Sequence, residues 1–400
     1  MNKHIRDIAA EIGSGITPLR STIRFWNSND IPWVKTEQLG AYQIFDAYEY
    51  ISRVAAEETN IRIWPANTVT VAMYGEGKTR GSVSVLMNPM ATNQACCNII
   101  VNPQEADFRF LYYWIKTNYR QLRALSSGVR KNLNSDDIKG FPFPSIDVTY
   151  QTKIADVLSS LDNKIQNNAS ICAELEAMAK TIYDYWFTQF DFPNDEGKPY
   201  RSSSGEMVWN EQLKREIPKG WATTTIGVIT ENFDSQRVPL SQNQRESIKG
   251  TIPYYGATGI MDYVNDYIFD GQYVLIAEDG SVMDISGHPI VQMIWDKTWV
   301  NNHAHVLRGI KNYSNEILYF ILKGIPVVKI MTGSIQKKIN QDNLNNYCVP
   351  SIPKEILNRF YAHTKGIFEQ IHQLELENNE LIKLRDWLLP MLMNGQARVE

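Results

Sequence analysis

The chain has 400 residues, of which 43% are apolar and 21% charged, and its formal net charge is −4. This is the composition of an ordinary globular protein with room for two or three cores, and it excludes a disordered, fibrous or strongly basic chain. Because the N-terminal segment has no apolar signal core and no later run is long enough to span a bilayer, we expect a cytoplasmic protein without membrane contact.

Residues 1–148 alternate short β-rich runs with turns, which is typical of a mixed α/β domain. The runs 68–73 and 82–86 flank the loop 74–81 and predict a β-hairpin. Residues 107–126 carry apolar side chains at helical spacing and predict a helix.

A long helix is predicted over residues 149–187, where apolar residues alternate spacings of four and three over more than four heptads. The predicted seam positions of this helix are Ile154, Leu158, Leu161, Ile165, Asn168, Leu175 and Ile182.

Residues 188–352 repeat the plan of the first domain after a linker rich in Pro, Gly and Ser. The runs 273–277 and 289–294 predict two strands joined by a turn, and residues 315–323 predict a helix.

A second long helix is predicted over residues 353–400, with the same heptad template. Arg385 interrupts its apolar stripe, and Leu384 is expected to cover that position. Its predicted seam positions are Phe360, Ile367, Ile371, Leu374, Asn378, Leu381 and Leu388.

A long helix with one apolar stripe must bury that stripe, so each long helix is the simplest partner for the other. Antiparallel pairing would place the two domains at opposite ends in a pseudo-twofold arrangement. It would also bring Asn168 and Asn378 within about one helical turn, where a polar pair can fix the register. The predicted fold is therefore α+β, with two similar mixed α/β domains separated by an antiparallel coiled coil.

The two domains repeat one another in sequence. Residues 128–146 read GVRKNLNSDDIKGFPFPSI and residues 333–352 read GSIQKKINQDNLNNYCVPSI, with Asn134 aligned on Asn340. Residues 91–95 align with residues 300–304 in the same way. A repeat this long indicates one duplicated domain, and two similar sites in one chain favour a reader of a long polymer such as DNA over an enzyme with one pocket.

Motifs for catalysis or cofactor binding find little support. Residues 72–79 read AMYGEGKT, but a phosphate loop needs Gly in place of Ala72 and a following helix rather than a strand. His303 and His305 would share a strand face, but their aligned positions, Gln94 and Cys96, could not form the same site, so we expect no metal. None of the four cysteines has zinc-ligand spacing, and free thiols are expected.

The repeated loops and the hairpin tip carry the residue types that contact DNA. Arg and Lys can bond guanine or phosphate, and Asn and Gln can bond adenine. Residues 108–135 and 317–341 contain basic side chains and no acid. A solvated helix face followed by a turn is the alternative reading, and the recurrence in both domains makes the two readings about equal. The candidate contacts are Lys78, Arg80, Arg120, Arg123, Gly128, Arg130, Lys131, Asn132, Asn134, Gly333, Ser334, Gln336, Lys337, Lys338 and Asn340.

Over nearly its whole length the chain resembles the specificity subunit of type I restriction-modification enzymes. Besides the repeated loops, the resemblance is carried by the segments 158–167 (LSSLDNKIQN), 183–193 (YDYWFTQFDFP), 197–209, 218–221 (PKGW) and 386–395 (DWLLPMLMNG). The resemblance implies a non-catalytic subunit with target-recognition domains at 1–148 and 188–352, each reading one half of a bipartite DNA site. The helical spacers, 149–187 and 353–400, would set the gap between the halves and dock modification subunits.

The resemblance also implies the partners: double-stranded DNA, two modification subunits, and restriction subunits that act as an ATP-dependent translocase and nuclease. S-adenosylmethionine, ATP and Mg²⁺ would belong to those subunits, with no cofactor in this chain. Two alternatives stay open, namely a nuclease or methyltransferase with an unrecognised active site and a scaffold that binds only proteins. Turnover by the purified chain would favour the first, and salt-dependent DNA binding by the assembled complex would exclude the second.

Overall fold

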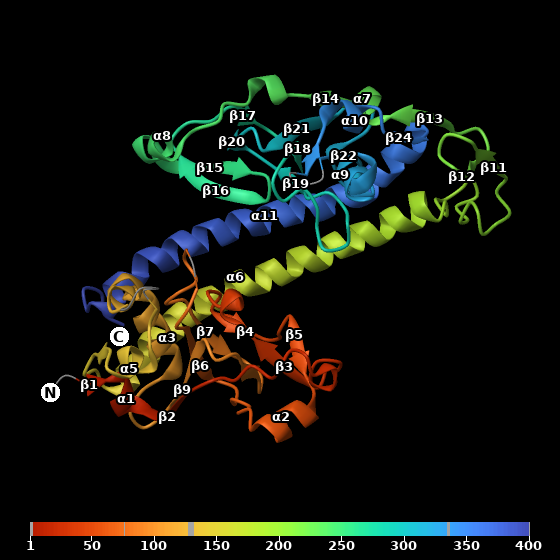
Figure 1. Ribbon diagram of the computed structural model, residues 1–400. Helices are drawn as coiled ribbons and strands as arrows, with labels where there is room; N and C mark the ends of the chain where they lie inside the picture. The colour runs from red at the N-terminus through yellow and green to blue at the C-terminus, as the bar shows by residue number, and fades with distance from the viewer. Residues whose placement is uncertain (1–2, 76, 127–131, 334–336, 400) are drawn as a thin grey trace. The chain divides into compact units, whose positions relative to one another are not determined.

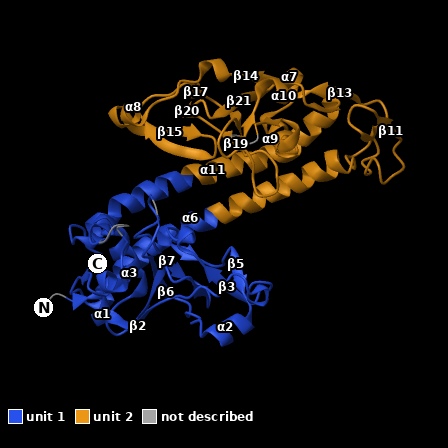
Figure 2. Ribbon diagram, viewed as in Figure 1, with its two compact units in different colours: residues 1–168, 377–400 blue, residues 169–376 orange. Residues whose placement is uncertain are grey.

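The computed structural model describes residues 3–75, 77–126, 132–333 and 337–399. The chain divides into two compact units, residues 1–168 with 377–400 and residues 169–376 (Figure 2). Each unit holds one of the two repeated domains together with part of both long helices (Figure 1). In the described part of the chain, no helix is long and apolar enough to cross a membrane.

The first unit is built on a five-stranded sheet in the order β2-β9-β6-β7-β4, antiparallel except for the β7–β4 pair. Its central strands read TVTVA and VSVL, and every residue in both is buried, as expected for β-branched runs covered on both faces. Helix α3 (Phe108–Thr117) packs on β6 and β7. The strands of this sheet are β2 (Ala9–Ser14), β4 (Gln43–Ile44), β6 (Thr68–Ala72), β7 (Val83–Leu86) and β9 (Cys96–Val101).

Shorter elements complete the first unit. A three-stranded sheet has the order β5-β3-β8, with β3 parallel to β8, and β1 pairs with β10. These elements are β1 (Lys3–His4), α1 (Ile5–Ile8), β3 (Ile31–Val34), β5 (Glu49–Ile51), α2 (Arg53–Thr59), β8 (Ala91–Thr92), α4 (Tyr119–Ala124), α5 (Ser135–Lys139), β10 (Pro142–Phe143) and the short 3-10 turns Ile23–Phe25 and Thr36–Gln38.

The second unit contains a four-stranded sheet in the order β14-β21-β18-β19, which matches the β2-β9-β6-β7 part of the first unit's sheet and, among the described residues, has no strand equivalent to β4 in it. Helix α9 (Asn315–Lys323) packs on β18, β19 and β21, and Ser314 caps its first turn. A second sheet has the order β16-β15-β20-β17, with β15 parallel to β20. These strands are β14 (Thr230–Asn232), β15 (Lys249–Gly256), β16 (Gly259–Val264), β17 (Phe269–Asp270), β18 (Tyr273–Ala277), β19 (Val291–Ile294), β20 (Lys297–Val300) and β21 (Ala304–Gly309).

Three two-stranded pairs and several short helices complete the second unit: β11 with β12, β13 with β24, and β22 with β23. Their bounds are β11 (Met207–Asn210), β12 (Arg215–Pro218), β13 (Ala222–Thr225), α7 (Ile226–Ile229), α8 (Gln242–Ser247), β22 (Met331–Thr332), β23 (Lys338–Ile339), α10 (Gln341–Asn345), β24 (Cys348–Ser351) and the 3-10 turns Asp234–Gln236 and Val327–Lys329.

The shared strand order confirms that one domain has been duplicated, and it corrects one predicted alignment. Cys96 pairs with Ala72 as Ala304 pairs with Ala277, so the counterpart of Cys96 is Ala304 and not His305. A turn that both domains share fixes this alignment of the two sequences. The Oδ1 atoms of Asn93 and Asn301 each accept a hydrogen bond from the amide two residues later, at 3.2 and 2.8 Å.

The predicted hairpins at 68–86 and 273–294 and the helix at 315–323 are confirmed. The helix predicted over 107–126 is instead two helices, α3 and α4, which meet at Asn118. The Asn118 side chain donates to the Trp114 carbonyl at 2.9 Å, and the regular series of backbone hydrogen bonds of α3 ends there.

The two long helices are α6 (Val148–Tyr183), followed by a π-helical turn (Asp184–Thr188), and α11 (Lys354–Met393). In the first unit their segments run antiparallel, and Asn168 Nδ2 donates to Asn378 Oδ1 at 3.0 Å, as predicted for this pair. Asn168 is fully buried, and Asn378 Nδ2 donates in turn to the Ile165 carbonyl at 3.1 Å. All the predicted seam residues of both helices are buried or half-buried.

The expectation for Arg385 is wrong. Leu384 is 42% exposed and does not cover the seam, whereas the Arg385 guanidinium lies on the seam at 2.6 Å from the buried carboxylate of Asp162. Asp162 also accepts from the Tyr113 hydroxyl at 2.7 Å. An ion pair with a further hydrogen bond satisfies the buried charge, so an arginine is tolerated in an otherwise apolar stripe.

In the second unit the antiparallel helix segments meet through aromatic side chains. The rings of Phe187 and Phe360 are 5.1 Å apart, and those of Trp186 and Phe360 are 5.9 Å apart. All three residues are buried, and burial of each such side chain stabilises the unit by about 1.5–3 kcal/mol.

Candidate nucleic-acid interface

The tip of the β6–β7 hairpin is held by helix α4. The Tyr119 hydroxyl donates to the Lys78 carbonyl at 2.7 Å, and the Arg123 guanidinium lies 5.2 Å from the Tyr119 ring and donates to its hydroxyl. Gly81 has a φ of +84°, and a Cβ there would lie 2.9 Å from Arg123 Cγ, so only glycine allows this close packing. Tyr119 is not among the contacts predicted from the sequence, although its four-residue spacing from Arg123 on a helix predicts that the two side chains are neighbours.

Four predicted contacts lie on these two elements: Lys78 and Arg80 on the hairpin tip, and Arg120 and Arg123 on α4, the helix that holds it. Lys78 and Arg120 are exposed, while Arg80 and Arg123 are half-buried. Within the described ranges none of the four forms a salt bridge, whereas Arg109 on the preceding helix pairs with Asp107 and Asp156. Among the described residues, these four basic side chains therefore have no ion-pair partner, on a chain of negative net charge, and this arrangement suits phosphate groups.

The loop predicted at 128–134 is only partly within the described residues, since Gly128, Arg130 and Lys131 lie outside them. The Leu133 amide donates to the Met73 carbonyl at 3.0 Å, which places the end of this loop at the start of the hairpin loop. Asn132 is half-buried. Asn134 is exposed, but its Oδ1 caps α5 by accepting from the amides of Asp136 and Asp137.

The equivalent loop of the second unit forms a small hairpin between β22 and β23. Gly333 opens it with a φ of +83°, and the Ile339 amide donates to the Glu278 carbonyl at 2.8 Å, as Leu133 does to Met73. Lys337 is half-buried with its Nζ 3.7 Å from the Met283 sulfur. Ser334 and Gln336 lie outside the described residues.

Two of the predicted contacts in this loop already have partners inside the protein. Lys338 Nζ is 2.8 Å from the Glu278 carboxylate, and this hydrogen bond raises the pKa of the lysine. Asn340 caps α10 by accepting from the Asp342 amide at 2.7 Å. Helix capping therefore explains why asparagine recurs at both Asn134 and Asn340, and it leaves the amide nitrogen as the group free to act as a donor to other molecules.

His305, Asp234 and Glu278 bring three potential metal-ligand atoms within 4.8 Å of one another. His305 Nε2 donates to the Ile339 carbonyl at 3.0 Å, and its Nδ1 faces the Asp234 carboxylate, so both ring nitrogens act as donors. Burial opposes the charged ring, but the hydrogen bond and charge of Asp234 outweigh it and raise the pKa of His305.

Cations already surround the two carboxylates of this cluster. The three cations are His305, Arg237 and Lys338. The Arg237 guanidinium lies 2.6 Å from Glu278 and 3.3 Å from Asp234, and Lys338 Nζ lies 2.8 Å from Glu278. The arrangement does not fit a metal ion, because a protonated histidine cannot be a ligand and an added dication would face three positive groups. The cluster instead fastens the β22–β23 hairpin to β18 and β21.

Comparison with known proteins adds a family match. The sequence profile described as type I restriction modification DNA specificity domain matches residues 1–177 and 218–385. The chain is 28% identical over 428 aligned residues to the type I restriction enzyme MjaIX specificity subunit of Methanocaldococcus jannaschii, covering 100% of this chain and 93% of that protein. Over 128 residues, 32% of each protein, it is 35% identical to a putative type I restriction enzyme specificity subunit of Haemophilus influenzae.

A solved structure shares the fold. The S subunit of a type I restriction-modification system from M. genitalium superposes with a TM-score of 0.55 and 17% sequence identity, covering 98% of this chain and 95% of that one.

Proposed function

This chain belongs to the type I restriction modification DNA specificity family, and on that premise we propose which of its surfaces contact DNA and its partner subunits. It is the non-catalytic specificity subunit of a type I restriction-modification system, and its two domains recognise DNA sequence. It associates with DNA and with modification and restriction subunits.

In the first domain, the DNA-contacting surface is the hairpin tip with Lys78 and Arg80 and the adjoining residues of α4, Arg120 and Arg123. The assignment rests on one observation: the tip and the helix that holds it carry four basic side chains, none of which has a carboxylate partner in the described part of the chain. An unpaired cation releases counterions from DNA without first breaking an internal ion pair, so its whole charge is available for phosphate. Asn132 and Asn134, at the described end of the loop predicted from Gly128 to Asn134, are further candidates, because Leu133 between them is bonded to Met73 at the start of the hairpin loop.

In the second domain, the loop from Gly333 to Asn340 is the corresponding contact. Support comes from its equivalent place in the duplicated sheet, where Ile339 pairs with Glu278 as Leu133 pairs with Met73. Since Lys338 is paired with Glu278, Lys337 and the amide of Asn340 are the stronger candidates for contact. This domain would therefore rely less on phosphate attraction and more on hydrogen bonds than the first domain.

The long helices would set the gap between half-sites and dock two modification subunits. Leu384 and Trp387, 42% and 58% exposed, lie three residues apart on one face of α11 in the first unit and offer an apolar docking surface. S-adenosylmethionine, ATP and Mg²⁺ would be bound by the partner subunits, and the assembled complex would work in the cytoplasm.

Binding of the assembled chain and modification subunits to DNA duplexes tests the proposed surfaces. Affinity should fall steeply with salt for the unmodified complex, and less steeply when basic residues of the hairpin tip are replaced. An unchanged salt slope in those variants would place the DNA elsewhere on the protein.

A further inference from the structure

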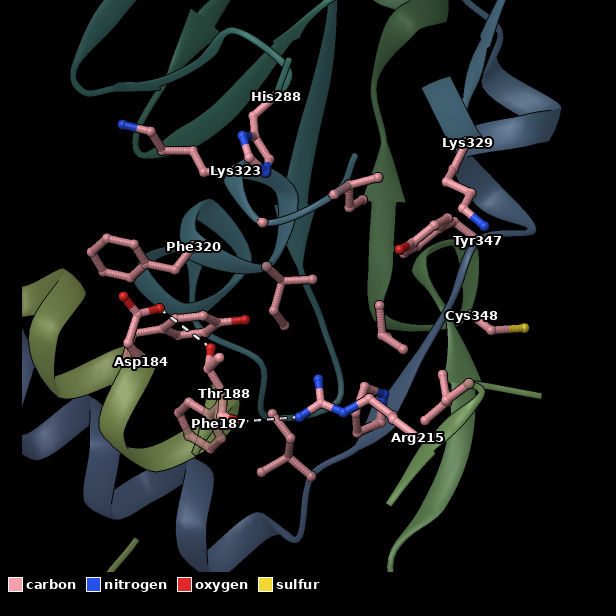
Figure 3. Close-up of a pocket in the computed structure, with 18 of the residues that line it drawn as sticks. Asp184, Phe187, Thr188, Arg215, His288, Phe320, Lys323, Lys329, Tyr347 and Cys348 are labelled. Atoms are coloured by element: carbon pink, nitrogen blue, oxygen red, sulfur yellow. Dashed lines mark hydrogen bonds between the residues drawn. The ribbon is translucent and has the colours of Figure 1, made fainter. Parts of the chain in front are cut away.

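A pocket of about 1030 Å³ lies within the second unit, lined by the end of α6, the β11–β12 hairpin, α9 and β24 (Figure 3). Its walls include the aromatic side chains of Tyr183, Phe187, Trp221 and Phe320. The volume is at the upper end of the range of about 300–1,000 Å³ that holds compact ligands. A peptide segment of several residues fits such a space.

Arg215 extends from β12 into this pocket, toward the end of α6 (Figure 3). Its guanidinium donates to the Thr188 carbonyl at 3.1 Å and lies 4.5 Å from the centre of the Phe190 ring. Burial lowers the pKa of Arg215, yet a guanidinium stays charged at neutral pH. One carbonyl uses one of its five N–H donors, and no described carboxylate forms a salt bridge with it.

The acidic residues that line the pocket are already engaged. Asp184 pairs with Lys180, and Glu176 lies 2.6 Å from Lys323 Nζ. The Asp284 side chain accepts from the amides of Ser286 and His288 at 2.8 and 3.0 Å. None of these three carboxylates forms a salt bridge with Arg215.

A second cation adds to the imbalance. Lys329 lines the same pocket, is exposed, and forms no salt bridge with any residue that the structure describes. The pocket thus combines an apolar wall with a surplus of positive charge.

We propose that this pocket binds an acidic peptide segment of the modification subunit, with a carboxylate on Arg215 and a neighbouring apolar side chain against the aromatic wall. A guanidinium matches a carboxylate through two parallel hydrogen bonds, and Phe187 and Phe320 match an aliphatic or aromatic residue beside it. A phosphate of a DNA duplex has no apolar flank to place against that wall. The inference rests on the proposed docking of modification subunits and names one contact through which it occurs.

The test is the affinity of the full chain for the purified modification subunit, measured for Arg215→Gln, Arg215→Lys and Lys329→Gln. Arg215→Gln should weaken binding about tenfold or more, because it leaves a carboxylate of the partner unpaired. The affinity of Arg215→Lys should lie between that of Arg215→Gln and that of the unmodified chain. Lys329→Gln should weaken binding about threefold. The matched control is Arg201→Gln. Arg201 is exposed, pairs with Glu216 next to Arg215, and does not line the pocket, so this variant should bind the modification subunit like the unmodified chain.

The outcomes separate the pocket from the proposed function. If the unmodified chain fails to bind the modification subunit, the docking and the pocket assignment both fall. If it binds, and both Arg215→Gln and Lys329→Gln bind within twofold of it, only the pocket assignment is overturned. Lys329 is exposed, so its variant keeps the test valid even if Arg215→Gln destabilises the unit. Weaker DNA binding with unchanged subunit binding would identify the anion as a DNA phosphate and contradict the proposal.

Discussion

The loop after β6 in the first domain and the loop after β18 in the second occupy the same place in a duplicated sheet but differ in charge. The first carries one acid, Glu76, and two basic residues, Lys78 and Arg80, which form no salt bridges within the described chain. The second carries Glu278, Asp279 and Asp284, and its Glu278 neutralises Lys338. The shared framework therefore determines where a loop is presented, while the loop sequence determines what it can contact. Two domains of one fold can thus read unlike half-sites.

The largest effect is expected in the first domain. Lys78→Gln combined with Arg120→Gln should lower the DNA affinity of the assembled complex by roughly one to two orders of magnitude and reduce its salt slope by about two. Both side chains are exposed, so the fold should be unaffected. Fluorescence anisotropy at several salt concentrations measures both quantities.

The matched control is Arg24→Gln combined with Arg62→Gln, which removes the same charge from the same domain. These arginines pair with Glu58 and Glu11, and their replacement should leave the slope unchanged within about half a unit. Equal effects from both double variants would mean that net charge, and not the hairpin tip, governs binding.

The helix contacts also differ between the units, with an asparagine pair in one and aromatic rings in the other. Asn168→Leu alone should destabilise the first unit by about 1–3 kcal/mol, because it removes the donor to the Oδ1 atom of Asn378. Leucine at both positions should recover the stability but allow mixed registers or oligomers. Chemical denaturation and native mass spectrometry report the two effects, and a single unchanged species for the double variant would rule out the register role.

In the second domain, His305→Gln tests whether the ion cluster holds the β22–β23 hairpin. The pKa of His305 is raised above its ordinary value of about 6.5, so the stability it contributes is full below that pH and is lost as pH rises through the raised value. Asp234 and Glu278 have lowered pKa values, so their contribution is present at neutral pH and is lost only in acid.

Thermal melts between pH 5.5 and 9 should therefore show that the free energy of unfolding of the unmodified chain exceeds that of His305→Gln by about 1 kcal/mol at the acidic end. This difference should narrow as pH rises. A variant of His363, which is exposed on α11, is the control. A gap that is independent of pH would mean that His305 is neutral in the folded protein.

The smallest effect is expected for Lys338→Gln. Because Lys338 is already paired with Glu278, its loss should change the salt slope by less than one and the affinity by no more than about threefold. A slope change as large as that of the first-domain double variant would show that Lys338 leaves Glu278 to contact DNA.

The sequence alone predicts features that depend on local pattern. The heptads, the two hairpins and the helix over 315–323 follow from periodicity, and the Asn168–Asn378 contact follows from assuming antiparallel pairing of two equal stripes. The candidate interface was predicted as a list of basic and amide residues, without information on which were already paired.

What the sequence could not supply depends on residues far apart in the chain. Only folding brings Arg385 into contact with Asp162, Lys338 with Glu278, and Arg215 with the end of α6. The split at Asn118 depends on one side-chain hydrogen bond that periodicity does not register. The one-residue error at His305 arose because two adjacent asparagines, Asn301 and Asn302, could each be aligned with Asn93, and only the turn hydrogen bond identifies Asn301.

The two domains each read one half of a bipartite DNA site for the modification subunits. A genome-wide map of methylated adenines in cells with and without the gene tests it most directly. The account predicts a split sequence motif that is methylated when the chain is present and unmethylated when it is removed. A map that is unchanged by the deletion, in cells that express the modification subunit, would contradict it.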